Sequence, residues 1–269
     1  MSLISEEETI RSIVRSSVES FSEGFRSRHE GEADDPDGTI NSKIHNVFIA
    51  VLGDELRYYT ALVRSFDSSL GNMLEKMAIN IAKLFYIVKR NVSGPLSIEQ
   101  TQRIAELLEK YKRREKCPSV GDYQGLRDKL KDSTIGERRH ESDYYLIDKE
   151  NNLHSLIELK IGGDLDNKKA RSEKEAILEQ FAILSNTLPE SKNIRIYFAT
   201  AYNKFGEGND WIQGRVRQYF ADKELLIGKD FWNFICKSDH GYEIVLDEYK
   251  NSSRFIKSAL ESIKRRYLG

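Results

Sequence analysis

The chain has 269 residues, of which 39% are hydrophobic and 32% charged, and its formal net charge is -1. This length and apolar content are enough for a packed core. The N-terminus has no basic start followed by an apolar run, and no stretch approaches the roughly 18 apolar residues of a membrane span. These features argue against secretion and membrane insertion, so we expect a cytoplasmic protein. The two cysteines form no CxxC pair and the five histidines are scattered, which argues against disulfides and structural zinc.

The first third of the chain has mainly helical patterns. Residues 9–27 carry apolar side chains at helical spacing, and so do residues 44–62 and 70–89, which we predict to be core helices. Residues 31–38 have the composition of an exposed loop. After the break at Gly94-Pro95, Ser97 and Gln100 predict a capping box that begins a charged helix reaching Tyr111.

The pattern changes in the middle of the chain. Residues 143–148 (DYYLID) and 153–161 (LHSLIELKI) are short apolar runs joined by a turn-like segment, which predicts a β-hairpin. Ser172 is expected to cap a helix, and residues 193–200 (NIRIYFAT) to form a buried strand. Further helices are expected over residues 211–220, 231–236 and 253–267.

This order predicts one α/β domain whose mixed central sheet is flanked by helices and joined by a helical N-terminal part. Within this single domain, we expect residues 1–115 to be mainly helical and residues 140–236 to form the α/β core. Residues 250–269 would form a C-terminal helix.

Three polar residues of the predicted hairpin carry the main functional signal. Residues two apart on a strand project to the same face, so Glu158 and Lys160 should point together, while the turn returns Asp143 beside them. Two carboxylates suit Mg²⁺, which can polarise a phosphate and lower the pKa of a bound water, while Lys160 orients that water or stabilises developing charge.

The spacing of this motif is not specific by itself. An acidic residue two positions before a lysine also occurs at 166/168, 190/192 and 248/250. Glu158 differs because Leu156, Ile157, Leu159 and Ile161 surround it, and an unpaired charge is costly on a buried strand. A structural ion pair between Glu158 and Lys160 is the alternative interpretation.

These residues resemble the motif of the PD-(D/E)XK nucleases and of the type II restriction endonucleases among them. The resemblance covers about residues 64–236 and includes Gln180 on the helix that follows the motif. It implies a restriction-endonuclease-like core and a Mg²⁺ site formed by Asp143 and Glu158, with Glu75 on a preceding helix as a further acidic ligand. The sequence departs from the motif at Ser142, where the name-giving proline would stand.

A second resemblance concerns DNA recognition. Arg171-Ser172-Glu173-Lys174 is similar to elements by which some restriction enzymes read adjacent G·C pairs, since Arg or Lys donates to guanine and Glu accepts from cytosine. The alternative is a charged first turn of a helix. Separately, residues 64–71 (RSFDSSLG), with the helix after them, resemble enzymes that cleave GGNCC-type sites.

Four more residues are candidates for DNA contacts. Lys168 and Lys169 are expected to bind phosphates, and Asn203 and Lys204 lie in a loop after a strand end, where they could face DNA. Tyr123, Tyr202 and Trp211 could stack on bases, but such residues more often lie in cores or interfaces, so we do not assign them to the site.

The leading hypothesis is a homodimeric, Mg²⁺-dependent type II restriction endonuclease that cuts double-stranded DNA at a short, G·C-containing palindrome. One alternative is a structure-selective or repair nuclease with the same centre. Another is a non-catalytic DNA-binding protein in which the three charged residues form an ion-pair network. No GxxxxGK[ST] loop, HExxH or GxSxG motif is present, so we expect no nucleotide cofactor.

Overall fold

The computed structural model describes residues 5–127, 135–148, 150–189 and 193–269. Within strand β2 the side chains of Ile135, Glu137, Glu141 and Asp143 lie outside this description. The chain forms two compact units, one of residues 1–80 with 243–269 and the other of residues 81–242. That the two units together form the single endonuclease domain expected from the sequence stays a prediction.

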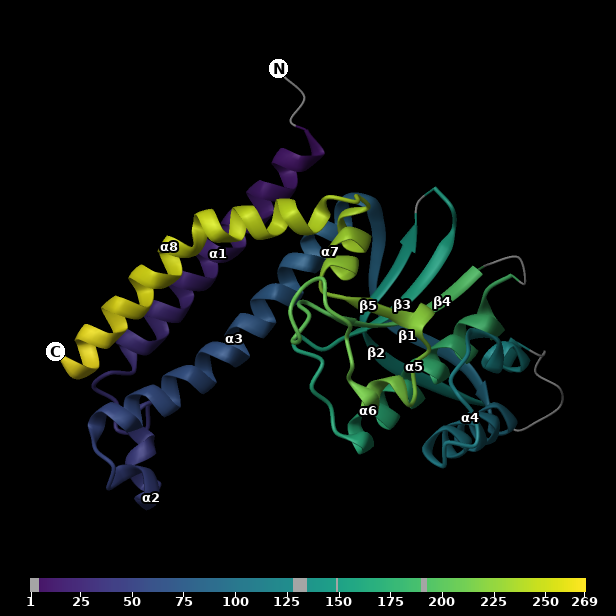
Figure 1. The fold of residues 1–269 in the computed structure, drawn as a ribbon, viewed down its shortest axis with the longest axis horizontal. Helices are drawn as coiled ribbons and strands as arrows, with labels where there is room; N and C mark the ends of the chain where they lie inside the picture. The colour runs from purple at the N-terminus through teal and green to yellow at the C-terminus, as the bar shows by residue number, and fades with distance from the viewer. Residues whose placement is uncertain (1–4, 128–134, 149, 190–192) are drawn as a thin grey trace. The chain divides into compact units, whose positions relative to one another are not determined.

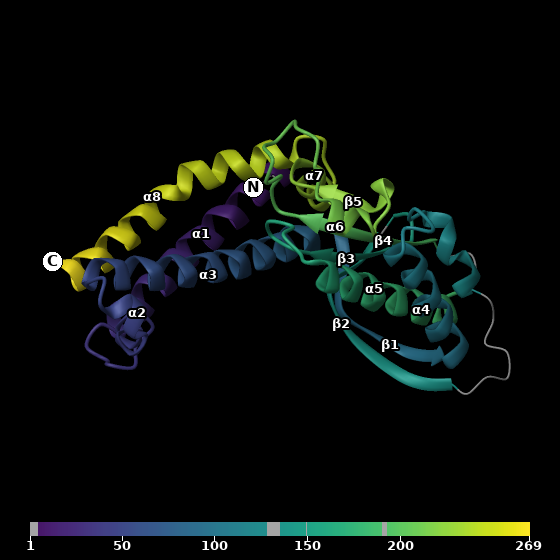
Figure 2. The same ribbon diagram turned by 60° about the horizontal axis from the view of Figure 1, so that its bottom comes forward.

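The first unit, called the helical unit, is built on three long helices (Figures 1 and 2). These are α1 (Glu6–Gly31), α3 (Asp54–Phe85) and α8 (Gly241–Leu268). Ser5 caps α1 by accepting a hydrogen bond from the Glu8 amide. Helices α1 and α8 are joined by the ion pair of Arg15 with Glu248, at 2.8 Å, and by a hydrogen bond from Ser262 to Glu30.

A short segment of the helical unit departs from the prediction of a core helix over residues 44–62. It comprises η1 (Asn41–His45), α2 (Val47–Ala50) and the start of α3. Tyr58, Ala61 and Leu62 are buried as expected, but most of the apolar residues before them are exposed. We call the exposed set the apolar tip: Ile44, Val47, Phe48, Val51, Leu52, Leu56, Tyr59 and Val63. Periodicity marks an apolar face but does not show what covers it.

The second unit contains a mixed five-stranded sheet, as the sequence predicted. Its strands are β1 (Tyr86–Ser97), β2 (Ile135–Asp148), β3 (Leu153–Leu159), β4 (Asn193–Thr200) and β5 (Leu225–Ile227), and they lie in this order. The first three pair antiparallel, while β3, β4 and β5 pair parallel. The register of β1 and β2 shifts between Lys89 and Asn91.

Helices cover both faces of this sheet. Helix α5 (Asn167–Thr187) packs against β1, β3 and β4, with α4 (Ile98–Lys112) beside it. On the other face Phe231 and Phe234 of α7 (Lys229–Cys236) contact Tyr144 and Tyr197. The short elements η2 (Val120–Arg127), α6 (Gly214–Arg217) and η3 (Asp222–Glu224) complete the unit. Among the described residues, no helix has the length and apolar content needed to cross a membrane.

Several predicted boundaries are confirmed and others are wrong. The hairpin, the strand over 193–200 and the capping box of Ser97 and Gln100 are confirmed. The helix predicted over 70–89 ends at Phe85, where β1 begins. Helix α5 begins before Ser172, because Asp166 caps it by accepting a hydrogen bond from the Lys169 amide. The helix expected over 211–220 is limited to α6, and the last helix starts earlier, at Gly241.

Candidate active site

Glu158 lies at the end of β3, beside the core that α5 covers. It lies two residues after Leu156 and therefore on the same face of the strand, and Leu156 is fully buried in this core. Glu158 is paired in the sheet with Phe198 of β4. The strand pattern therefore directs its carboxylate toward the side of α5. Its side chain is 12% exposed, so a carboxylate is held near the surface on a strand that is otherwise apolar.

Lys160 follows β3 directly and lies between two carboxylates. Its ammonium group contacts Oε1 of Glu158, which confirms that the two side chains project to the same side. The same Nζ lies 3.1 Å from Oε1 of Glu173 on α5. The Lys160 amide also donates to the carbonyl of Ala199, which fixes the backbone against β4. We call Glu158, Lys160 and Glu173 the Lys160 cluster.

Glu173 therefore has a different position from the one expected. The sequence suggested that it accepts a hydrogen bond from cytosine, but its carboxylate is bound to the lysine of the motif. This contact was missed because Glu173 is distant from Lys160 along the chain. The contact could have been anticipated, because a helix that follows a strand usually packs back against the sheet.

The backbone of Asp143 lies in β2, and its side chain is outside the described residues. Tyr144, which follows Asp143, is paired with Ile157, which precedes Glu158. The antiparallel ladder thus brings the positions of Asp143 and Glu158 to the same end of the hairpin. Glu75 lies on α3 in the helical unit, where it is half-buried. The roles of both acidic residues stay predictions.

The turn after Lys160 is closely packed. A Cβ on Gly162 would lie 2.7 Å from the hydroxyl of Tyr202, and a Cβ on Gly163 would lie 3.0 Å from the ring of Trp211. Gly163 also has a φ of 65°, which favours glycine. The exposed Tyr202 and the buried Trp211, both left outside the predicted site, thus support the turn beside Lys160.

Lys204 reaches the same turn. Its Nζ lies 3.1 Å from Oδ1 of Asp164, and this hydrogen bond and the lysine charge lower the pKa of Asp164. Asn203 is buried, and both ends of its amide are used: Nδ2 donates to the carbonyl of Asn209, and Oδ1 accepts from the amide of Phe205. These bonds shape the loop and argue against the DNA contact predicted for Asn203.

The basic residues at the start of α5 have unequal environments. Lys168 and Lys169 are exposed in its first turn. Arg171 is half-buried, and its Nε has no hydrogen-bond acceptor among the described residues. Phosphate contacts by the two lysines and a base contact by Arg171 stay predictions.

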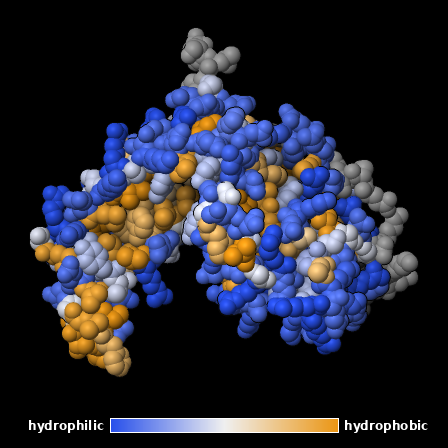
Figure 3. Space-filling model, viewed as in Figure 1, coloured by the Kyte–Doolittle hydropathy of each residue, from blue (hydrophilic) through white to orange (hydrophobic). Residues whose placement is uncertain are grey.

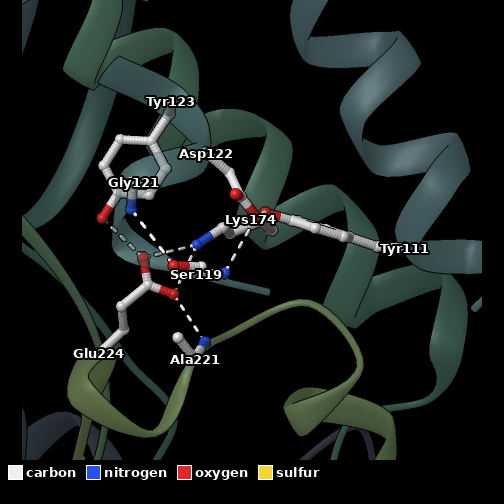
Figure 4. A network of polar contacts seen from close by, with 8 residues as sticks. All are labelled: Tyr111, Ser119, Gly121, Asp122, Tyr123, Lys174, Ala221 and Glu224. Atoms are coloured by element: carbon white, nitrogen blue, oxygen red, sulfur yellow. Dashed lines mark hydrogen bonds and ion pairs between the residues drawn. The ribbon is translucent and has the colours of Figure 1, made fainter. Parts of the chain in front are cut away.

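Lys174 is buried in a separate polar network (Figure 4). We call Lys174, Glu224 and Tyr123 the Lys174 cluster. Both charged side chains are 1% exposed, and Nζ lies 2.9 and 2.8 Å from the two carboxylate oxygens of Glu224. Tyr123 and the Ala221 amide also donate to this carboxylate. Burial lowers the pKa of Lys174, and Glu224 opposes this change. The predicted DNA contact of Lys174 is not compatible with this arrangement, because the ammonium is inside the protein.

The Lys160 cluster offers suitable chemistry for a magnesium ion. Carboxylate oxygen is the ligand type that Mg²⁺ prefers, and Glu158 presents it at the end of the hairpin that also carries Asp143. Among the side chains that the structure describes, no three His, Cys, Asp or Glu residues form a ready metal site. A complete site that includes Glu158 would therefore need a residue whose side chain lies outside this description, such as Asp143.

The comparisons with known proteins identify a family. The family model of the type II restriction endonuclease HinfI matches residues 6–253. No curated protein and no solved structure matches the chain. Because the family match covers most of the sequence, this chain belongs to the HinfI family of type II restriction endonucleases, which are enzymes that cleave DNA at specific sites.

Proposed function

We propose that this endonuclease hydrolyses phosphodiester bonds through a Mg²⁺-dependent PD-(D/E)XK centre formed by Asp143, Glu158 and Lys160, with Glu75 as a further acidic residue. The observation that carries the proposal is the Lys160 cluster, in which the ammonium of Lys160 contacts Glu158 at the end of β3. Placing two charged groups at the end of an otherwise buried strand costs free energy of folding. This cost favours a functional reason for the two charges.

Each residue has a distinct role in this proposal. Glu158 and Asp143 would hold the metal through hard oxygen ligands. Mg²⁺ held there would supply Lewis-acid chemistry, which polarises a phosphate and lowers the pKa of water. Lys160, whose side chain is 32% exposed, orients the attacking water or stabilises the charge that develops on the phosphate. Glu173 holds the lysine ammonium from the side of α5.

The substrate is double-stranded DNA with a short, G·C-containing palindrome, cut by a homodimer. Two-fold symmetry of the protein would match that of the site, and one centre would serve each strand. Arg171 is the remaining candidate for a guanine contact, with Lys168 and Lys169 on phosphates and Lys204 in the neighbouring loop. A GG/CC contact by the 171–174 element would require Arg171, Glu173 and Lys174 to act together on bases. Since Glu173 and Lys174 are engaged in ion pairs, we do not propose that contact. A GGNCC-type site rests only on the resemblance of residues 64–71 and stays a prediction.

The test is incubation of the purified protein with plasmid DNA in the presence of Mg²⁺ or EDTA, followed by sequencing of the fragment ends. Discrete fragments that require Mg²⁺ and share a palindromic end sequence are expected. A smear would point to a non-specific nuclease, and discrete cutting in EDTA would contradict the metal dependence. Intact DNA on several substrates would favour a DNA-binding role without catalysis.

A further inference from the structure

The apolar tip is an unusual surface for a protein that acts alone. Residues 47–52 read Val-Phe-Ile-Ala-Val-Leu, and none of these six residues is buried. Phe48 is 83% exposed and Val51 is 80% exposed. Figure 3 shows this hydrophobic surface at the end of the helical unit, over α2. Surface residues of this kind usually occur singly, so a continuous set calls for a specific explanation.

The exposed side chains are not part of the core of their own unit. On α3, Tyr58, Ala61 and Leu62 pack into the cluster formed with Phe25 and Ile263. Leu56, Tyr59 and Val63 lie on the same helix but outside this cluster, and they are 46%, 38% and 55% exposed. The start of α3 therefore has two apolar faces, of which one is covered within the chain.

The size of the surface corresponds to a stable interface. At about 150–200 Å² for a fully exposed large side chain, the exposed fractions of the apolar tip leave on the order of 800 Å². Monomeric proteins rarely expose contiguous apolar patches of more than about 300–600 Å². A specific protein–protein interface buries roughly 800 Å² on each partner.

We propose that a second copy of this chain covers the apolar tip, and that the two copies associate through the same surface about a two-fold axis. An isologous interface needs only one patch that pairs with itself, and two copies of the apolar tip can bury their apolar side chains against each other. The need for two copies rests on the proposed function, since cleavage of both strands of a palindrome requires two centres. The interface lies within the helical unit, and its residues are far along the chain from those of the Lys160 cluster.

The charges at the two ends of the segment support this pairing. Lys43 precedes the apolar run, and Glu55 follows it. If two copies of the segment run antiparallel across the axis, Lys43 of each copy meets Glu55 of the other. Opposite charges at the rim of an interface favour one orientation over its reverse.

The first experiment measures the oligomeric state of the full chain by sedimentation equilibrium over a wide range of concentrations. We expect a dimer, and the variants Phe48→Asp and Val51→Asp should each raise its Kd by about 30-fold or more, as truncation of a central interface residue does. Ile98→Asp is the matched control. Ile98 is 52% exposed at the start of α4 in the other unit, so this variant should remain dimeric. Circular dichroism should show unchanged helix content in all three.

Charge reversal then tests the orientation. Lys43→Glu and Glu55→Lys should each weaken the dimer several-fold, and the double variant should restore it, because the opposite charges are again paired. A double variant as weak as the two single variants combined would refute the antiparallel arrangement.

Other outcomes separate this inference from the proposed function. A wild-type chain that stays monomeric, or tip variants that stay dimeric, would overturn the proposed interface even if the enzyme cuts DNA. Dimeric tip variants that lose plasmid binding would assign the tip to DNA instead. A dimer that dissociates in Phe48→Asp but never cleaves DNA would support the interface and refute the proposed nuclease centre.

Discussion

Helix α5 contributes to two clusters that each combine a lysine with glutamate, and the two differ in accessibility. In the Lys174 cluster both charged side chains are 1% exposed, and the Glu224 carboxylate accepts from a lysine, a tyrosine and a backbone amide. In the Lys160 cluster the lysine is 32% exposed and lies between two carboxylates. In the first cluster, protein groups pair with both charged side chains. The second leaves charged groups at the surface, where a phosphate or a metal ion can reach them.

The comparison also separates stability from activity. Removing one partner of a buried ion pair leaves an uncompensated charge in a medium that solvates it poorly, so the main cost is in folding. Removing a member of a partly exposed cluster costs little folding free energy, because water replaces the lost partner. The following variants test this division, from the largest expected effect to the smallest.

Glu158→Ala and Lys160→Ala should each lower the cleavage rate by about 10³-fold or more, which corresponds to roughly 4 kcal/mol of activation free energy. On the proposed mechanism, the first change removes a metal ligand and the second removes the group that faces the phosphate. Plasmid cleavage under Mg²⁺ measures the rate, and Lys257→Ala, an exposed lysine on α8, is the control. Normal cutting by either site variant would show that the centre lies elsewhere.

Glu224→Gln should lower the free energy of unfolding by about 3–5 kcal/mol, because it leaves the charge of Lys174 buried without a carboxylate. Urea unfolding followed by circular dichroism measures this change. The double variant Lys174→Met with Glu224→Leu should recover most of the loss, since it removes both charges. A loss below about 1 kcal/mol in Glu224→Gln would mean that the pair is solvated, against its observed burial.

Glu173→Gln should lower kcat about 10-fold, roughly 1.4 kcal/mol, with little change in KM or in unfolding. The amide keeps the shape of the carboxylate but loses the charge that holds the ammonium of Lys160. Glu175→Gln, two residues further along α5, is the control and should cut normally. If Glu173 instead reads a base, its variant would relax the choice of site while kcat stays unchanged.

Tyr123→Phe should cost about 0.5–1.5 kcal/mol of unfolding free energy, because it removes one hydrogen bond to Glu224 while Lys174 and the Ala221 amide remain bound. Urea unfolding measures the loss, and cleavage should be unaffected. An effect as large as that of Glu224→Gln would mean that the tyrosine hydroxyl, and not the lysine, is the main partner of the carboxylate.

The sequence predicted the elements that have a clear local pattern. The runs around Tyr144 and Leu156 are short, apolar and joined by a turn-like segment, so the hairpin could be identified, and so could the strand over 193–200. The common side of Glu158 and Lys160 follows from strand geometry alone. These are properties of a few neighbouring residues.

The errors concern contacts between distant parts of the chain. Lys174 and Lys169 are similar in sequence, but only the first meets Glu224, fifty residues away. The contact of Glu173 with Lys160 depends on how α5 packs, and the exposure of Phe48 depends on what covers it. The end of α3 was missed because Tyr86 and Ile87 continue the apolar run of the helix, while their partners in β2 are far along the chain.

The Lys174 cluster also bears on how the second unit folds. Its members come from segments far apart in the sequence, with Tyr123 and Glu224 separated by 101 positions. The lysine loses its water shell only when all three segments are assembled, and pairings of such long range require loop closure first. We therefore expect the pair to form after the transition state, so that its loss speeds unfolding and leaves the folding rate almost unchanged. The cluster would then slow unfolding without changing the folding rate, and so set the lifetime of the folded enzyme.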